Sequence, residues 1–142
     1  MNKNELFGLT RLNRVKFLAF SGCTIIIGAL IQFVAVSYLP YFEGLYSQLV
    51  IPVIGLLLIV KFTAQRYMDV GASAFWAILM FTPTAPVIYV ICGLIKGDSV
   101  PNKYGQVPNE GNILLKIIAT VSLLTVVALV AWQGLSLTKP SI

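Results

Sequence analysis

Residues 66–76 read Arg66-Tyr67-Met68-Asp69-Val70-Gly71-Ala72-Ser73-Ala74-Phe75-Trp76, and a long apolar run lies on either side of them. On a helical continuation Arg66 and Asp69 are three residues apart, so they are neighbours that can neutralise each other. Two roles fit this pair. It can be a structural clamp that sets the angle of the elbow, which we favour, or Arg66 can contact a lipid phosphate or another ligand.

The rest of this stretch predicts the end of one helix and the start of another. Gly71 can adopt the left-handed conformation that ends a helix, and Ser73 can cap the next helix. Phe75 and Trp76 are the kind of aromatic residues that mark the entry of a helix into a bilayer. We therefore expect a polar elbow between two membrane segments.

The composition predicts a membrane protein. Of 142 residues, 58% are hydrophobic and 11% are charged, whereas soluble domains are about half apolar and about a quarter charged. No linker separates two halves, so we expect a single polytopic domain over residues 1–142. The formal net charge is +5. Because the basic residues flank apolar runs and do not form a stripe, we expect the lipid bilayer as partner and no nucleic acid.

Four apolar runs predict an all-α membrane protein with four transmembrane helices, at about 17–39, 45–62, 75–95 and 113–133. At about 1.5 Å per helical residue, the first run exceeds the roughly 30 Å of hydrocarbon to be crossed. It is also longer than the roughly 7 to 15 apolar residues of a cleaved signal peptide. Pro52 is expected to bend the second helix.

The third run has two possible topologies because Pro83-Thr84-Ala85-Pro86 interrupts it. Two prolines there fit either a kinked crossing or a re-entrant hairpin of two half-helices. The length of the run favours the crossing, which is our expectation. The alternative, three crossings plus a hairpin at 75–95, would put Lys96 and Lys103 on the same side as the other basic residues.

The charge distribution predicts the orientation. Residues 1–16 carry four basic residues, Arg11 and Arg14 among them, and one acidic residue. We therefore expect the amino terminus in the cytoplasm, with this segment partly amphipathic in the headgroup region. The turn at 40–44 carries Glu43 and no basic residue, as expected of an outside loop.

The first predicted helix carries features of an association surface. Gln32 lies in its outer half, where a side-chain amide either seeks a hydrogen bond on a neighbouring helix or faces interfacial water. Gly22, Gly28 and Ala29 provide a small surface that permits close approach of another helix. This pattern favours a membrane-protein partner or self-association.

Three motifs carry a family resemblance: Arg11-Leu12-Asn13-Arg14 followed by Phe17, then residues 65–76, then Pro101-Asn102-Lys103-Tyr104-Gly105. In order and spacing they resemble the signatures of the bacterial inner-membrane family called domain of unknown function eight hundred and five. The chain departs from that family at Gln65, where the family has Arg, and at Met68, where it has His. The resemblance implies a small multi-spanning protein of the bacterial inner membrane and no established activity.

The candidate structural or interaction residues come from these signatures and from the spans. They are Arg66, Asp69, Gly71, Trp76, Arg11, Arg14, Gln32, Pro83, Asn102, Tyr104 and Gly105.

Catalytic chemistry is not expected. The chain has no histidine, which excludes Ser–His, Cys–His and His–metal arrangements, and it has no glycine-rich phosphate loop. Cys23 and Cys92 lie in apolar segments without a CxxC spacing, so neither a disulfide nor a zinc site is predicted. A carboxylate pair of Asp98 with Asp69 would need both loops on one side, which only the hairpin topology allows. We expect no enzyme, no cofactor and no metal.

Two functions remain. The first is an accessory membrane protein that associates with another membrane component. The second is a transporter or pore subunit, favoured by the proline-broken third run and by Gln32. Transport pathways usually place ionisable groups inside the membrane, and here only Lys61 and Lys116 lie near span edges. We expect no buried charge, and this favours the first function.

Overall fold

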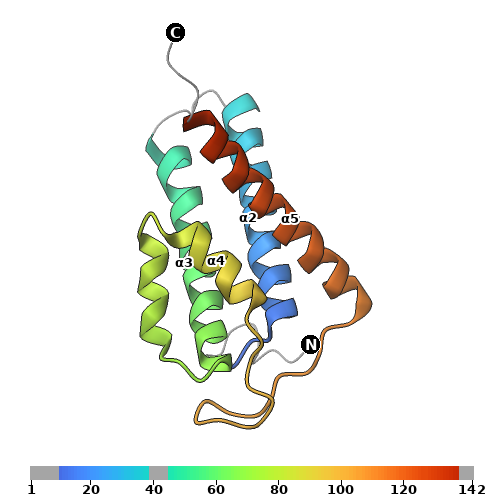
Figure 1. Ribbon diagram of the computed structural model, residues 1–142. Helices are drawn as coiled ribbons and strands as arrows, with labels where there is room; N and C mark the ends of the chain where they lie inside the picture. The colour runs from blue at the N-terminus through green and yellow to red at the C-terminus, as the bar shows by residue number, and fades with distance from the viewer. Residues whose placement is uncertain (1–9, 39–44, 138–142) are drawn as a thin grey trace.

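Helices dominate residues 10–38 and 45–137, the part of the chain that the computed structural model describes (Figure 1). The elements in chain order are α2 (Arg14–Tyr38), α3 (Leu45–Asp69), the 3₁₀ helix η2 (Ala74–Phe81), α4 (Ala85–Leu94) and α5 (Ile113–Leu137). The all-α class is confirmed. The turn with Glu43, and the amphipathic segment as far as residue 9, lie outside the described residues.

Asparagine side chains begin two of the long helices. The side-chain oxygen of Asn13 accepts the N–H of Lys16 at 2.8 Å, and that of Asn112 accepts the N–H of Leu115 at 3.0 Å. Each bond satisfies one of the free donors that every helix has in its first turn. The start of α2 at Arg14 and of α5 at Ile113 follows from these caps.

The elbow forms as its sequence predicts, although α3 continues beyond the predicted end at 62, to Asp69. Gly71 has a φ of +74°, its N–H donates to the carbonyl of Met68 at 3.3 Å, and that of Ala72 donates to the carbonyl of Tyr67 at 2.9 Å. This pattern is a Schellman motif, which needs a left-handed residue. Ser73 then caps η2 by accepting the N–H of Phe75.

Two helical segments are long and apolar enough to cross a membrane, namely Arg14–Ala35 in α2 and Leu49–Asp69 in α3. Two shorter apolar segments, Ala85–Leu94 and Ile113–Ala128, accompany them. Figure 1 shows α2 and α3 running side by side, with α5 crossing α2 obliquely. The hairpin of η2 and α4 packs against α3.

The segment 75–95 forms two short helices, η2 and α4, where one long helix was expected, and their fold-back has the shape of the hairpin alternative. The chain leaves η2 at Thr82, whose φ of −102° and ψ of 161° are extended. The residue before a proline avoids the helical region, and Pro83 has no N–H to continue the ladder. At about 2.0 Å per 3₁₀ residue and about 1.5 Å per α residue, each half spans about 15 Å. Both ends of the hairpin return to Asp69, whose carbonyl accepts the N–H of Asp98 at 2.8 Å.

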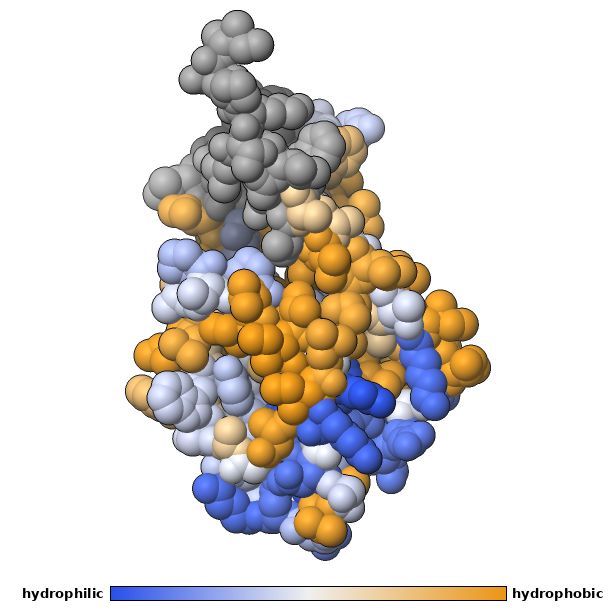
Figure 2. All heavy atoms as spheres, viewed as in Figure 1, coloured by the Kyte–Doolittle hydropathy of each residue, from blue (hydrophilic) through white to orange (hydrophobic). Residues whose placement is uncertain are grey.

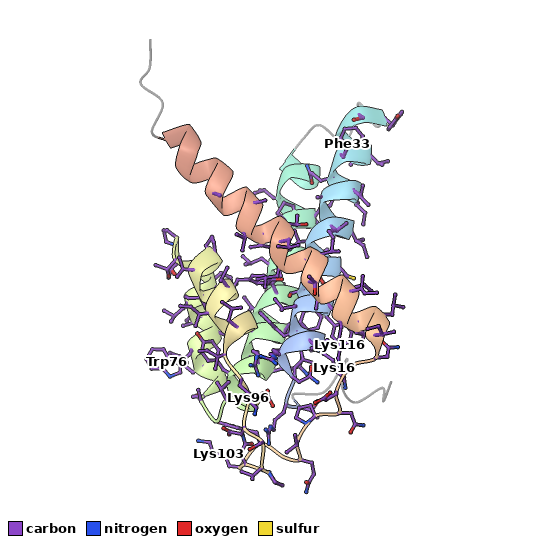
Figure 3. The ribbon with its side chains drawn as sticks, turned by 45° about the vertical axis from the view of Figure 1, so that its right-hand side comes forward. Lys16, Phe33, Trp76, Lys96, Lys103 and Lys116 are labelled. Carbon is purple, nitrogen blue, oxygen red and sulfur yellow. The ribbon has the colours of Figure 1, made fainter. Side chains whose placement is uncertain are left out.

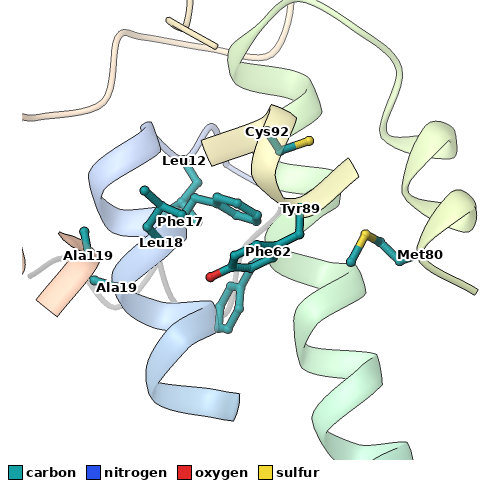
Figure 4. Packing of buried hydrophobic residues seen from close by; sticks show 9 residues of the cluster. All are labelled: Leu12, Phe17, Leu18, Ala19, Phe62, Met80, Tyr89, Cys92 and Ala119. Atoms are coloured by element: carbon teal, nitrogen blue, oxygen red, sulfur yellow. The ribbon is translucent and has the colours of Figure 1, made fainter. Parts of the chain in front are cut away.

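The apolar core lies between the hairpin and the start of α2 (Figure 4). The rings of Phe17 and Tyr89 have centroids 5.3 Å apart. The hydroxyl of Tyr89 lies 3.0 Å from that of Ser21 and 3.1 Å from that of Ser122, and all three side chains are buried. These three hydroxyls therefore satisfy one another inside the core. The remaining core residues include Leu12, Leu18, Phe62 and Cys92.

Close helix approach occurs at Gly22 and not at Gly28. A Cβ on Gly22 would overlap the side chain of Ser122, because α5 crosses α2 at this point. A Cβ on Gly28 would meet nothing within 4 Å. The prediction of a close contact is therefore correct for Gly22, whereas Gly28 and Ala29 line a hollow beside α3.

The face of the molecule drawn in Figure 2 has an apolar band above a polar end. Figure 2 shows hydrophobic atoms across the middle of the molecule and hydrophilic atoms gathered below them. Lys16, Lys96, Lys103 and Lys116 lie toward that polar end, whereas Phe33 lies near the opposite end of α2 (Figure 3). The exposed side chains of every described helix include large apolar residues.

Replacing Gly22 by alanine should destabilise the protein, because the added methyl group overlaps Ser122 and the crossing helices must separate. Overpacking of this kind costs about 1–3 kcal/mol. The matched variant Gly28→Ala, in the same helix, should be neutral or slightly stabilising since its site is open. Thermal unfolding of purified protein in detergent measures both. Equal shifts of the two midpoints would contradict the crossing geometry.

Candidate functional site

Two arginines converge on one aspartate at the polar end of the molecule. The Nε of Arg11 donates to Oδ1 of Asp69 at 3.2 Å, and Arg66 binds Oδ2 of the same carboxylate. The three residues are 3%, 1% and 2% exposed for Arg11, Arg66 and Asp69 respectively. The ion pair of Arg66 with Asp69 that the sequence predicts is therefore present, with a second arginine added to it.

Arg11 also ties a distant loop to α3. Its Nη1 donates to the carbonyls of Val100 at 2.9 Å and Gly105 at 3.1 Å. Its Nη2 donates to the carbonyl of Asp98 at 2.7 Å. The planar fork of a guanidinium can serve several acceptors at fixed angles, and here it joins residues 87 to 94 positions apart.

Arg66 binds the end of the hairpin in a similar way. Its Nε donates to the carbonyl of Cys92 at 2.9 Å, and its Nη2 donates to the carbonyl of Ile95. These carbonyls belong to the last turn of α4, where helix acceptors have no partner within the helix. A cation at a helix carboxyl terminus is also electrostatically favourable. Arg66 therefore caps α4 while it neutralises Asp69.

Asn102, which belongs to the third signature, joins the 98–105 loop to this network. Its Nδ2 donates to the carbonyl of Met68 at 3.0 Å and to Oδ2 of Asp98 at 2.8 Å. Its Oδ1 accepts the N–H of Tyr104 at 2.9 Å. Asn102 and Gly105 also exchange backbone hydrogen bonds, and the φ of Gly105 is +125°, which favours glycine. This turn is held against the end of α3.

Glycine at position 97 leaves space for the buried carboxylate. A Cβ on Gly97 would overlap the side chain of Asp69 and approach that of Arg66. The chain after α4 can therefore pass close to the network only because Gly97 has no side chain. This requirement lies outside the three signatures and was not predicted.

The structure brings most of the predicted residues together and leaves four apart. Arg11, Arg66, Asp69, Gly71, Asn102, Tyr104 and Gly105 lie around the network. Arg14 is exposed beside it, and Trp76 is 51% exposed on η2, with its ring on that of Phe75. Gln32 lies in the α2–α3 hollow, and Pro83 lies in the bend between η2 and α4.

The expectation of no buried charge is wrong. Arg11, Lys16, Arg66 and Asp69 are all buried. Within its own segment each of these groups stands at the edge of an apolar run, and its burial comes from other segments packed against it. One feature of the sequence points to the network: each of the three signatures contains a side chain or a glycine suited to a hydrogen-bonded turn.

The family described as "Protein of unknown function (DUF805)" matches residues 9–106 of this chain. The chain belongs to this family. The matched range contains every residue of the hydrogen-bonded network described above, from Arg11 to Gly105, and it ends before α5 begins. No curated protein and no solved structure matches the chain. The resemblance of the three motifs is therefore confirmed.

The network is suited to holding segments together. Asp69 has one guanidinium on each carboxylate oxygen, and both arginines also donate to backbone carbonyls. Within the described ranges, no three His, Cys, Asp or Glu side chains are placed to hold a metal ion. These contacts hold the end of α4 and the 98–105 loop against the end of α3.

Arg66→Ala and Asp69→Ala should each lower the free energy of unfolding, because the first leaves one oxygen of the buried Asp69 carboxylate without its guanidinium and the second leaves two buried arginines without their anion. Breaking such a pair costs about 3–5 kcal/mol. The double variant should cost less than the sum of the two, with a positive coupling in a double-mutant cycle in detergent. Arg66→Lys should recover little, since lysine lacks the planar fork. The exposed Lys103→Ala is the control; additive losses would show that Arg66 and Asp69 do not interact.

Proposed function

We propose that this DUF805 chain is a multi-pass protein of the bacterial inner membrane, and that its helices α2, α3 and α5 cross that membrane. The hairpin of η2 and α4 enters the bilayer and returns to the same side. The apolar faces that the described helices expose support this arrangement. Each half of the hairpin reaches about half of the roughly 30 Å needed for a crossing.

The basic residues support a cytoplasmic polar end. Among the described residues, each lysine and arginine belongs to the 11–16 segment at the start of α2, the last third of α3, the 96–103 segment or the start of α5. These four places lie at one end of the bundle (Figures 1 and 3). Positive charge flanking membrane segments is retained in the cytoplasm, so the elbow and the 98–105 loop belong there.

The function that we propose is association with a transmembrane helix of another membrane protein. The observation that carries it is the Oε1 of Gln32, which is buried and has no hydrogen-bond partner among the described residues. An unpaired buried acceptor costs about 1–3 kcal/mol. A partner helix with a Ser, Thr, Asn or Gln donor would remove that cost, so an accessory protein is the function that best fits.

The space around Gln32 suits a helix. A hollow of about 320 Å³ lies on one side of the α2–α3 seam and another of about 300 Å³ on the other. Gly28 and Gly55 line both hollows, and a Cβ on either would meet nothing within 4 Å. Small residues at such a seam permit close backbone approach of another helix.

We propose no catalytic role. The charged side chains of the signatures are engaged with one another and with backbone carbonyls, apart from the exposed Arg14 and Lys103. Occupied groups of this kind support the structural role of Arg66 over a role in binding a ligand. A reacting substrate would need free acids, bases or nucleophiles in a shared cleft.

A conduit is the second candidate, and the broken hairpin favours it. Interrupted helices expose carbonyls that can line a path. Against it, the hydroxyls within the bundle bond to one another, as Ser21, Tyr89 and Ser122 do. The side chains at the bend do the same, with Thr82 and Thr84 hydroxyls 2.6 Å apart.

The topology predicts a labelling pattern in intact cells. A cysteine introduced at position 43 should react with an impermeant thiol reagent, whereas cysteines at positions 70 and 103 should react only after the membrane is permeabilised. The parent chain, with its natural Cys23 and Cys92, measures the background. Labelling at 103 without labelling at 70 would show that the 75–95 segment crosses the membrane and would contradict the hairpin.

The association predicts that Gly28→Leu and Gln32→Leu remove a copurifying membrane protein while leaving insertion intact. A Cβ at position 28 meets nothing within 4 Å, so leucine there projects into the hollow, and leucine at 32 cannot accept a hydrogen bond. Val53→Leu, exposed on α3 and outside both hollows, is the control. Retention of the partner by both test variants, or ion flux in reconstituted vesicles that is lost on Pro83→Ala with Pro86→Ala, would contradict association.

A further inference from the structure

A second groove runs along α2 on the side of α4 and α5, and it has two parts that share residues. The apolar part has a volume of about 310 Å³ and lies among the three helices. The polar part has a volume of about 400 Å³ and lies below it, toward the cytoplasmic end. Arg14, Val15 and Lys116 line both parts, so the groove is continuous.

The apolar part has the form of a slot for a hydrocarbon chain. Leu18 forms its floor, because α4 approaches α2 so closely that a Cβ on Gly93 would press on the Leu18 side chain. Leu94 on one side and Leu124 on the other are exposed walls. Along α5 the lining runs from Lys116 to Leu124, a length of about 12 Å in an α-helix.

The polar part carries cations that the protein does not neutralise. Among the described residues, neither Arg14 nor Lys96 forms an ion pair, and both are exposed. Lys116 is 50% exposed and lies 3.7 Å from the carboxylate of Glu110, which is itself 91% exposed, so this pair is weak.

Of the other acids of the polar part, Asp69 is neutralised and Asp98 is bonded to an amide, without an ion pair among the described residues. Asp69 is held by Arg11 and Arg66, and Oδ2 of Asp98 accepts a hydrogen bond from Asn102. Arg14, Lys96 and the weakly paired Lys116 therefore remain to meet an anion. Figure 3 shows Lys96 and Lys116 at the polar end, below the apolar band of the surface.

We propose that this groove binds an anionic phospholipid, with its phosphate among Arg14, Lys96 and Lys116 and one acyl chain in the slot between α4 and α5. Basic pockets between helices on the cytoplasmic side suit anionic headgroups. Guanidinium and ammonium groups are the usual donors to phosphate oxygens. The adjoining slot selects a lipid over free phosphate. The inference rests on the membrane location proposed above, and it is independent of the α2–α3 association.

Native mass spectrometry of the full-length protein in detergent tests this proposal, with dioleoylphosphatidylglycerol and dioleoylphosphatidylcholine as probes. Phosphatidylglycerol should bind more tightly, and Arg14→Ala combined with Lys96→Ala should weaken its binding by about thirtyfold. Lys103→Ala removes one charge from the same end of the molecule outside the groove, and it should change binding little. Equal binding of the two lipids, or an equal loss with Lys103→Ala, would overturn the proposal.

A second pair of variants tests the slot without touching the cations. Thr120 lines the apolar part and Thr125 does not, while both are exposed on α5 and each hydroxyl donates to the carbonyl four residues earlier at 2.9 Å. Thr120→Phe should weaken phosphatidylglycerol binding by tenfold or more, and Thr125→Phe should not. Equal effects of the two would show that no acyl chain occupies the slot.

Two further measurements distinguish a failure of the lipid proposal from a failure of the proposed membrane location. Millimolar inorganic phosphate should not displace the bound lipid; displacement would reassign the site to a free anion and overturn the lipid proposal. Recovery of the variants in the membrane fraction, after alkaline extraction, tests the membrane location by itself. A chain that remains in the membrane and binds both lipids equally would refute this inference and leave the proposed function standing.

Discussion

The carboxylate of Asp69 lies between the guanidinium groups of Arg11 and Arg66, and the rest of the structure depends on this buried interaction. A carboxylate taken out of water needs both its oxygens satisfied. Here one partner, Arg66, lies on the same helix, and the other, Arg11, lies 58 residues away in the chain. The other donors of each arginine bind carbonyls that have no partner within a helix. Arg66 binds those of Cys92 and Ile95, and Arg11 binds those of the 98–105 loop.

The hairpin of η2 and α4 shows how local chemistry and this network act together. Pro83 prevents a continuous helix, which explains why the chain bends. It does not explain why the chain returns to its starting point. The return is held by Arg66 at the end of α4, by the backbone bond from Asp98 to Asp69, and by the space that Gly97 leaves open. A polar clamp at the base therefore closes a hairpin whose bend is set by proline.

The two arginines of the first signature have different surroundings. Arg11 is buried in the network, whereas Arg14, three residues later, is exposed at the mouth of the groove beside α4 and α5. The network thus holds the polar end together and leaves two separate surfaces for partners. One is the α2–α3 seam around Gln32, suited to a helix, and the other is the basic-mouthed groove, suited to a lipid.

The sequence by itself determined the helical class, the elbow and the pairing of Arg66 with Asp69. These depend on neighbours along the chain: apolar runs, a glycine that can turn left-handed, and charges one helical turn apart. Only the tertiary structure decided that the 75–95 segment folds back, that Arg11 joins Asp69, and that Gly22 and Gly28 differ. Those outcomes depend on contacts between residues far apart in the chain, because burial of a charge and the space beside a glycine are set by the segments packed against them. No local pattern records which segment that will be.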